Sequence, residues 1–152
     1  RILLLGGGVG CAPLTTVAVT YPDREYISYI GFATKSSVMF LSDFEKFGKT
    51  VLCTDDGTVG RKGYVTEVLR EDIAEIKPDV ILTCGSTPML KAAARLSLET
   101  KIPAYMSGET RMGCGVGACL VCACAVREKN GEAVNKRACV DGPVFRLEDV
   151  IL

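Results

Sequence analysis

The 152-residue sequence contains no histidine. Without imidazole the chain cannot supply the histidine ligands of a Rieske centre or of a histidine-based zinc site, and it has no histidine general base. We therefore do not expect proton-transfer catalysis from this chain.

The sequence also has no net charge and no long apolar run. Eighteen basic residues balance eighteen acidic ones, so net charge favours neither nucleic acid nor an anionic bilayer as a partner. No apolar run approaches the roughly 20 residues of a membrane span, and no basic segment precedes a small-residue cleavage site. We expect a cytoplasmic protein. Because the sequence starts at Arg1, without Met and inside an apolar run, we also expect a fragment.

A chain of 152 residues, of which 48% are hydrophobic, is long enough for one domain of Rossmann size with its own core and a small appendage. Apolar runs alternate with helix-like segments, which is typical of an α/β, doubly wound, five-stranded parallel sheet with its ligand crevice at the carboxyl ends of the strands. The predicted strands are Ile2–Leu5, Tyr26–Phe32, Thr50–Thr54, Val80–Cys84 and Ala104–Ser107, and the predicted helices are Ala12–Val19, Ser36–Phe47, Tyr64–Ile76 and Pro88–Leu98.

The pattern changes after Ser107, which divides the chain into a nucleotide domain over residues 1–107 and a small C-terminal β module over residues 108–152. The module opens with the glycine-rich segment Gly108–Gly117. Two strands, Cys122–Arg127 and Glu132–Cys139, then flank Asn130-Gly131, a dipeptide that favours a type I′ hairpin turn.

Four of the eight cysteines have the spacing of a [2Fe–2S] site. Cys114-x4-Cys119-x2-Cys122, followed by Cys139, matches the plant-type ligand pattern. The interleaved glycines allow the loop to wrap closely around a cluster, and their amides can donate hydrogen bonds to the sulfur atoms. The hairpin would return Cys139 beside the other three, so we predict these four cysteines as cluster ligands.

Other interpretations of the cysteines stay open. Structural zinc usually shows two paired knuckles, a thioredoxin-like dithiol would use only Cys119 and Cys122, and a purely structural role would leave five clustered thiols without a metal. Cys124 alternates along the hairpin and is expected to be a packed thiol. Cys11, Cys53 and Cys84 lie in apolar contexts and are expected to be buried.

A glycine turn between the first strand and the first helix is the second signal. Leu4–Pro13 places three consecutive glycines and Gly10 where backbone amides and a helix N-terminus can approach a pyrophosphate. Pro13 stands where the third glycine of G-x-G-x-x-G would fall, so a plain tight turn is the alternative. No acidic residue follows the second strand, and Lys35 there suits either a 2′-phosphate or a solvated loop.

Two further polar loops are predicted at the same edge of the sheet. Cys84–Met89 follows the fourth strand with a Gly-Ser-Thr-Pro turn that leaves main-chain groups open to a ligand, although it is also an ordinary strand-to-helix turn. Thr54–Gly63 contains Asp55 and Asp56, for which turn chemistry is the first explanation.

Taken together, these segments resemble a known family. The resemblance rests on the Gly7–Leu14 turn, Thr54–Gly57, Cys84–Met89, the Arg111–Cys122 segment and Cys139-Val140-Asp141-Gly142-Pro143-Val144-Phe145. It is to the electron-transfer subunits of NAD-dependent dihydroorotate dehydrogenases, within the ferredoxin–NADP reductase superfamily. Similar small subunits occur in cytoplasmic sulfide dehydrogenases, ferredoxin:NADP oxidoreductases and some hydrogenases.

The resemblance implies an FAD-binding barrel, a nucleotide domain and a [2Fe–2S] module, of which this chain lacks the barrel, so it should hold FAD weakly. It implies that Gly8, Gly10 and Pro13 face the pyrophosphate of NAD(P), that Cys84 and Gly85 lie near the nicotinamide and flavin rings, and that Cys114, Cys119, Cys122 and Cys139 bind the cluster.

The implied function is electron transfer in pyrimidine biosynthesis, from FMN in a catalytic partner subunit through the cluster to FAD and NAD. The expected assembly is therefore a hetero-oligomer. A small subunit of a hydrogenase, sulfide dehydrogenase or ferredoxin:NADP oxidoreductase is the alternative, and a non-enzymatic redox or zinc-binding module is the third possibility.

Overall fold

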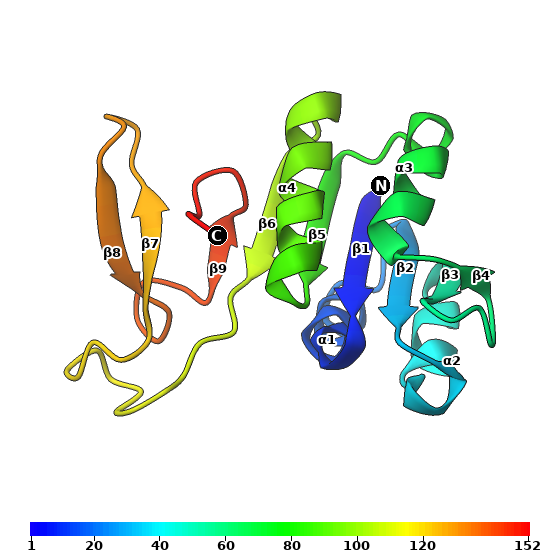
Figure 1. Cartoon of the computed structure of the whole chain (residues 1–152), viewed down its shortest axis with the longest axis horizontal. Coiled ribbons are helices and arrows are strands. Elements are labelled where there is room, and N and C mark those ends of the chain that lie inside the picture. The colour runs from blue at the N-terminus through cyan, green and yellow to red at the C-terminus, as the bar shows by residue number, and fades with distance from the viewer.

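The computed structural model describes all of residues 1–152 as a seven-stranded sheet flanked by helices, with a separate two-stranded hairpin (Figure 1). The large sheet has the order β4-β3-β2-β1-β5-β6-β9, and the hairpin pairs β7 with β8. The strands are β1 (Ile2–Gly7), β2 (Tyr26–Phe32), β3 (Gly48–Thr54), β4 (Arg61–Lys62), β5 (Val80–Cys84), β6 (Ala104–Ser107), β7 (Ala123–Arg127), β8 (Ala133–Arg137) and β9 (Val144–Arg146). The α-helices are α1 (Cys11–Thr20), α2 (Leu41–Glu45), α3 (Val65–Ile76) and α4 (Thr87–Thr100), and the 3₁₀ turns are η1 (Gly8–Gly10) and η2 (Lys35–Ser37).

The five predicted strands are confirmed as the parallel core of the large sheet. β1 lies at its centre, in parallel register with β2 on one side and β5 on the other. Two short strands extend the sheet beyond the predicted five: β4 pairs in parallel with β3, and β9 pairs antiparallel with β6. Strands of two and three residues are too short to show a period of two, so the sequence pattern could not reveal them.

The sheet separates two hydrophobic layers. α1 and α2 cover one face, where Leu4, Ile30 and Phe44 are buried, whereas α3 and α4 cover the other, where Leu5, Leu69 and Ala93 are buried. Successive strand residues point to opposite faces, so a nearly continuous apolar strand such as Leu3–Leu5 supplies both layers. In Figure 1, α3 and α4 stand in front of the sheet and the parallel strands end at its lower edge.

The prediction of one helix over Ser36–Phe47 was wrong. The segment forms the turn η2, a stretch at Val38 with extended backbone, and the short helix α2, which starts after Phe40 in the left-handed region with φ of 61°. The Ser37 hydroxyl donates to the Thr34 carbonyl, and the Thr34 amide donates to Ser37 Oγ. These local bonds compete with the helical ladder, as serine and threonine side chains commonly do.

The prediction of a type I′ turn at Asn130-Gly131 was also wrong. Only Gly131 has a positive φ, of 87°, whereas a type I′ turn needs positive φ at both central residues. The Gly131 amide donates to the Glu128 carbonyl and the Glu128 amide donates to the Glu132 carbonyl, which closes a three-residue loop ending in a left-handed glycine. The Asn130 side-chain oxygen supports this loop by accepting a hydrogen bond from the Glu132 amide.

The last residues of the chain connect the hairpin to the large sheet. The Arg127 amide donates to the Asp149 carbonyl, the Ile151 amide donates to the Ala125 carbonyl, and Val126 bridges to Val150. Because β9 belongs to the large sheet, the C-terminal segment contributes to both substructures. No helix in the structure combines the length and the apolar character needed to cross a membrane.

Candidate functional site

A cleft of about 950 Å³ opens at the carboxyl ends of the parallel strands, between α3 and α4. Its strand-end walls come from Gly7–Val9 after β1, Gly31–Ala33 at the end of β2, Asp55 after β3 and Ser86 after β5. Strand ends in an open α/β sheet are where ligands bind, and the start of α1 adds the partial positive charge of a helix N-terminus. The cleft therefore lies where the sequence predicts a nucleotide.

Gly8 is the predicted nucleotide-binding residue that lines this cleft. Its φ of 55° is in the left-handed region, and a Cβ added to it would meet no atom within 4 Å. Glycine adopts this conformation without strain, and the open space leaves its backbone accessible to a ligand. The assignment of Gly8 to pyrophosphate binding stays a prediction.

Gly10 and Pro13 are not among the residues that line the cleft. Gly10 is buried, and a Cβ there would lie 2.4 Å from the Cys84 carbonyl oxygen. Glycine at this position thus allows the start of α1 to approach the backbone at the end of β5. Pro13 lies in the first turn of α1 with its ring exposed. A pyrophosphate contact for these two residues stays a prediction.

Cys84 and Gly85 lie just beneath the cleft, at the end of β5. The Cys84 side chain is buried, and burial, followed by the nearby Glu109 carboxylate, raises the pKa of its thiol, against the opposing effect of the Ser107 hydroxyl. Gly85 allows Met89 to pack against the turn, because an added Cβ would lie 2.5 Å from the Met89 methyl carbon. A neutral thiol here can pack against a ring system but is a poor nucleophile at neutral pH.

The two aspartates of the β3–β4 loop have different surroundings. Asp56 accepts hydrogen bonds from the Thr58 hydroxyl at 2.7 Å and from the Thr58 amide at 3.0 Å, which hold the pKa of its carboxyl down at about 2. The predicted turn chemistry is confirmed for Asp56. The Asp55 amide donates to the Phe32 carbonyl at 3.0 Å, so Asp55 sits beside the end of β2, and it lines the cleft.

The helices α3 and α4 and the segments beside the cleft supply residues that sequence reasoning missed. Tyr64, Met39 and Arg95 line it, as does Arg70, whose guanidinium lies 3.3 Å from a Glu99 carboxylate oxygen. These side chains occupy ordinary positions on amphipathic helices or connecting segments. Only tertiary packing, including that of α3 beside α4, brings them together, so no sequence signal distinguished them. Lys35, by contrast, does not line the cleft.

The first pair of predicted cluster ligands lies in the exposed loop that follows β6. The amides of Val116, Ala118 and Cys119 donate to Cys114 Sγ at 3.2–3.4 Å, and the Cys114 amide donates to Cys119 Sγ at 3.3 Å. These bonds stabilise a thiolate and, led by the Val116 amide, lower the pKa of Cys114 to about 6. The backbone thus wraps around the sulfur atoms as the glycine-rich sequence predicts.

The second pair consists of Cys122 and Cys139, which flank the hairpin. Their sulfur atoms are 3.3 Å apart. Hydrogen bonds from the backbone amide and the thiol of Cys139 lower the pKa of the Cys122 thiol. The same thiol–thiol hydrogen bond raises the pKa of Cys139. The Ala138 amide also donates to the Cys122 carbonyl, which fixes the two ligand-bearing backbones side by side.

This arrangement of thiols fits a cluster of two irons. Two thiolates on one tetrahedral metal, each at about 2.3 Å, lie about 3.8 Å apart, which the Cys122–Cys139 separation of 3.3 Å approaches. No three or more histidine, cysteine, aspartate or glutamate side chains converge closely enough to hold one metal ion. A [2Fe–2S] cluster requires two thiolates at each of two irons rather than four at one centre. The donor set is therefore better matched to that cluster than to zinc.

The remaining cysteines have ordinary packing. Cys11 and Cys53 are completely buried, and burial raises the pKa of their thiols to about 12 and about 11. Cys124 is half-buried, and its thiol donates to the Lys136 carbonyl across the hairpin at 3.5 Å. These positions agree with the expected structural roles.

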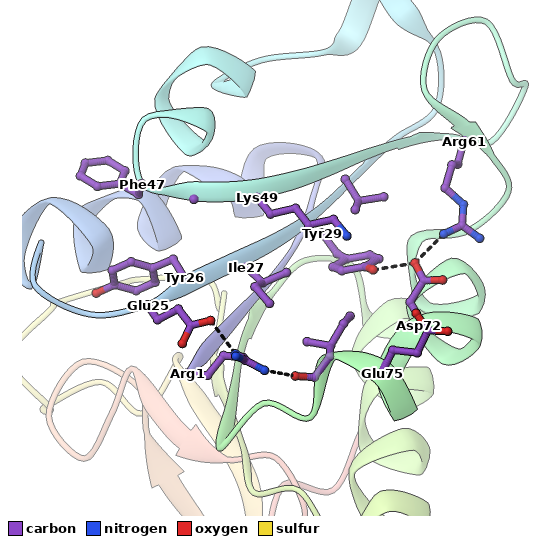
Figure 2. A pocket seen from close by; sticks show the side chains of 13 residues that line it. Arg1, Glu25, Tyr26, Ile27, Tyr29, Phe47, Lys49, Arg61, Asp72 and Glu75 are labelled. Carbon is purple, nitrogen blue, oxygen red and sulfur yellow. Dashed lines mark hydrogen bonds and ion pairs between the residues drawn. The ribbon is translucent and has the colours of Figure 1, made fainter.

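A second hollow, of about 790 Å³, lies beside α3 over β2 and β3, away from the predicted site (Figure 2). Its charged groups are largely paired with one another. The Tyr29 hydroxyl donates to Asp72 at 2.6 Å, Arg61 also donates to Asp72 at 2.5 Å, and Arg1 pairs with Glu25. Lys49 and Glu75 also line the hollow, but the charges of Arg1, Glu25, Arg61 and Asp72 are occupied by one another.

Comparison with known proteins identifies relatives for both parts of the chain. Residues 109–151 match the family described as the iron-sulfur cluster binding domain of dihydroorotate dehydrogenase B. The whole chain is similar to proteins named dihydroorotate dehydrogenase B (NAD(+)), electron transfer subunit. The relative from Caldanaerobacter subterraneus subsp. tengcongensis is 43% identical over 99% of this chain and 59% of its own length. The relative from Geobacillus thermodenitrificans is 43% identical over 100% of this chain and 58% of its own length.

Solved structures show the same fold. A chain of an NADH-dependent reduced ferredoxin-NADP oxidoreductase, studied for flavin-based electron bifurcation, is 33% identical, with a TM-score of 0.86 over 99% of this chain and 53% of that one. The ferredoxin reductase of carbazole 1,9a-dioxygenase is 21% identical, with a TM-score of 0.58 over 70% of this chain and 36% of that one. The predicted ferredoxin reductase-like architecture is confirmed, and the chain spans somewhat more than half of the curated relatives it matches.

Proposed function

We propose an electron-transfer function for the whole chain, because residues 109–151 match the family of iron–sulfur cluster binding domains of dihydroorotate dehydrogenase B. In this proposal, residues 1–107 bind NAD(H), residues 108–152 bind a [2Fe–2S] cluster, and FAD is held mainly by a further domain. When bound, these cofactors supply the redox chemistry, and the protein supplies binding, orientation and electrostatics.

One observation carries the proposal: two pairs of thiols lie in the segment that leaves the same sheet edge at which the cleft opens. β6 runs parallel to β5, and the loop with Cys114 and Cys119 follows directly from its end (Figure 1). A shared edge places both proposed cofactors at the same end of the sheet, which favours electron transfer between them.

The residues of the chain have defined tasks in this proposal. The four cysteines Cys114, Cys119, Cys122 and Cys139 hold the cluster, and the amides at Cys114 stabilise negative charge on its sulfur. The turn around Gly8 receives the pyrophosphate, and Cys84 and Gly85 support the ring that exchanges hydride. Asp55, beside the end of β2, is placed to accept the hydroxyl hydrogen bonds of an adenosine ribose, which favours NADH over NADPH.

The proposed physiological reaction is the transfer of electrons from dihydroorotate oxidation to NAD in pyrimidine biosynthesis. Its proposed partner is an FMN-containing catalytic subunit in a hetero-oligomer, and the chain alone would lack full activity. We place the complex in the cytoplasm, because eight free cysteines suit a reducing compartment. The similarity to the ferredoxin-NADP oxidoreductase chain supports a second candidate, a small subunit that exchanges electrons with ferredoxin.

The native complex that contains this chain separates the two candidates. Purified anaerobically, it should reduce NAD when dihydroorotate is added, and an FMN-containing subunit should copurify. NAD(P) reduction by reduced ferredoxin, without any response to dihydroorotate, would establish the second candidate instead. Absence of both flavin and iron from the complex would exclude both.

A further inference from the structure

Arg137, the last residue of β8, connects the two turns that carry the thiol pairs. Its Nη1 donates to the Gly117 carbonyl at 3.2 Å, and Gly117 lies between Cys114 and Cys119. Its Nε donates to Asp141 Oδ2 at 3.1 Å, and Asp141 lies two residues after Cys139. One guanidinium therefore contacts the loop of the first pair and the turn of the second.

The turn after Cys139 folds back onto Arg137. The Arg137 amide donates to Asp141 Oδ2 at 2.7 Å, while the amides of Val140 and Asp141 donate to the Arg137 carbonyl at 3.1 and 2.7 Å. Gly117 packs directly against this turn, since an added Cβ would lie 2.7 Å from a Val140 methyl and 3.1 Å from Arg137 Nη1. The contact requires glycine in a second way, because Gly117 has φ of 82°.

The pair also places two opposite charges beside the thiols. The side chains of Arg137 and Asp141 are only about a third exposed, at 36% and 30%, so water screens their charges less than it would screen fully exposed ones. Reduction adds an electron to a cluster, and a nearby positive charge stabilises the reduced form while a negative charge destabilises it. Removing either member of the pair leaves the other charge uncompensated.

We propose that Arg137 and Asp141 form a charged clip that joins the two ligand turns and sets the reduction potential of the cluster. The inference rests on the proposed cluster and deepens it. Arg137 and Asp141 are positioning residues here, because they act through the ligand turns and through their charge, without binding iron.

The test compares Arg137→Gln and Asp141→Asn, which break the same ion pair but change charge in opposite directions. The midpoint potential of the cluster is measured in the reconstituted full chain by redox titration monitored by electron paramagnetic resonance. Arg137→Gln should lower the potential and Asp141→Asn should raise it. A merely structural role would move both variants in the same direction, or lower iron content without a change in potential.

Lys136 and Glu128 offer a matched control on the same hairpin. Their ion pair, with 2.9 Å between Nζ and Oε1, makes no hydrogen bond to the ligand loop. The Lys136 charge reaches Asp141 only through space, whereas Arg137 is hydrogen-bonded to both ligand turns. Lys136→Gln and Glu128→Gln should shift the potential less than the clip variants do. Equal shifts from both pairs would overturn the specific role of the clip.

Variants that assemble little cluster still decide the question. Asp141→Asn keeps a side-chain oxygen that can accept a hydrogen bond from the Arg137 amide, so the cluster potential of this variant remains measurable if Arg137→Gln loses iron. A cluster potential in Asp141→Asn at or below that of the wild type overturns the proposal. If the reconstituted wild-type chain holds no [2Fe–2S] cluster, the proposed function fails and the clip fails with it. A normal wild-type cluster with unshifted variants refutes the clip alone.

Discussion

Single residues determine how closely the strand ends and the cysteine loops can approach one another. Gly10 brings the start of α1 against the Cys84 carbonyl, and Gly117 brings the first ligand loop against Val140. Neither position tolerates a Cβ at the distances found. The surroundings of each thiol determine its pKa, which is about 6 for Cys114 and about 12 for Cys11.

The distinction between Cys139 and Cys124 is testable by substitution. Cys139→Ala should abolish stable cluster assembly, because it leaves Cys122 without its neighbouring thiol. Cys124→Ala should retain the cluster, since that thiol donates to the Lys136 carbonyl within the hairpin. Visible absorbance and iron content after equal reconstitution are the measurements. Loss of the cluster in Cys124→Ala with retention in Cys139→Ala would show that the fourth ligand has been assigned incorrectly.

The buried Cys11 thiol predicts a dependence of stability on alkaline pH. Its pKa is about 12 in the folded chain and 9.0 in the unfolded one, because burial disfavours the thiolate. This contribution to stability is therefore fully present below pH 9 and is lost as the pH rises toward 12. Cys11→Ala should be less stable at pH 7 by about 1–2 kcal/mol, from the smaller side chain.

Cys11→Ala should, however, lose less stability than the wild type between pH 9 and pH 11, the interval above the unfolded pKa of the thiol. Denaturant unfolding at pH 7, 9 and 11 measures both effects. The other titrating groups are present in both proteins, so the comparison isolates Cys11. Parallel losses in the two proteins would mean that the Cys11 thiol is not desolvated.

Secondary-structure elements show where sequence patterns suffice and where packing takes over. The apolar core strands Tyr26–Phe32 and Val80–Cys84 match their predicted bounds, because a buried parallel strand is apolar along its whole length. The edge strand β9 could not be predicted, since its three residues gain their role only by pairing with β6. The segment after Thr34 failed because side-chain hydrogen bonds of Ser37 competed with helix formation.

The candidate site divides in the same way. The cysteine spacing and the glycine turn at Gly8 are local signals, so the sequence could indicate a glycine-rich cysteine loop after β6 and a turn after β1, which the structure contains. The opposite wall of the cleft, with Tyr64 and Arg95, depends on the packing of α3 beside α4 and left no local signal. Gly10 had a recognisable motif position, but its contact with Cys84 comes from a strand more than seventy residues further along the chain.

The pairing of β9 with β6 predicts that the C-terminal segment stabilises the large sheet. Phe145 is 9% exposed and belongs to the same hydrophobic core as Leu5 and Leu69. Phe145→Ala should therefore lower the free energy of unfolding by about 3 kcal/mol, as for other large-to-small changes in a core. Its neighbour Val144 is 56% exposed, and Val144→Ala should change the free energy by less than about 0.5 kcal/mol.

Far-ultraviolet circular dichroism during denaturant unfolding measures this effect on the large sheet. If Phe145→Ala removed the cluster without changing the free energy of unfolding of the sheet, β9 would stabilise only the C-terminal module and not the sheet.

At the scale of the whole molecule, the cleft and the cysteine loop lie at the same edge of the sheet. The cleft walls come from four strand ends and two helices, and the loop departs from a fifth strand at the same edge. In the proposed function, the nucleotide and the cluster are bound at the same edge of the sheet by separate sets of residues. Substitutions in the cleft should consequently change nucleotide binding without removing iron.

Asp55 tests that separation and the preference for NADH. Its carboxylate lines the cleft beside the end of β2, where it would repel a 2′-phosphate. Asp55→Asn should reduce the preference for NADH over NADPH about tenfold, which corresponds to about 1.4 kcal/mol. Titration calorimetry with both nucleotides, together with iron analysis, measures the two properties. As a control, Asp56→Asn loosens the loop by weakening the hydrogen bond from Thr58, and it should weaken the binding of both nucleotides equally. If Asp55→Asn left the preference for NADH unchanged, the adenosine ribose would bind elsewhere.

The central claim is that two thiol pairs hold two irons, and metal analysis of the anaerobically reconstituted chain tests it most directly. The account predicts two irons and two acid-labile sulfides per chain, with the electron paramagnetic resonance spectrum of a [2Fe–2S] cluster after reduction. One stoichiometric zinc per chain, retained in the presence of excess iron and sulfide, would contradict it.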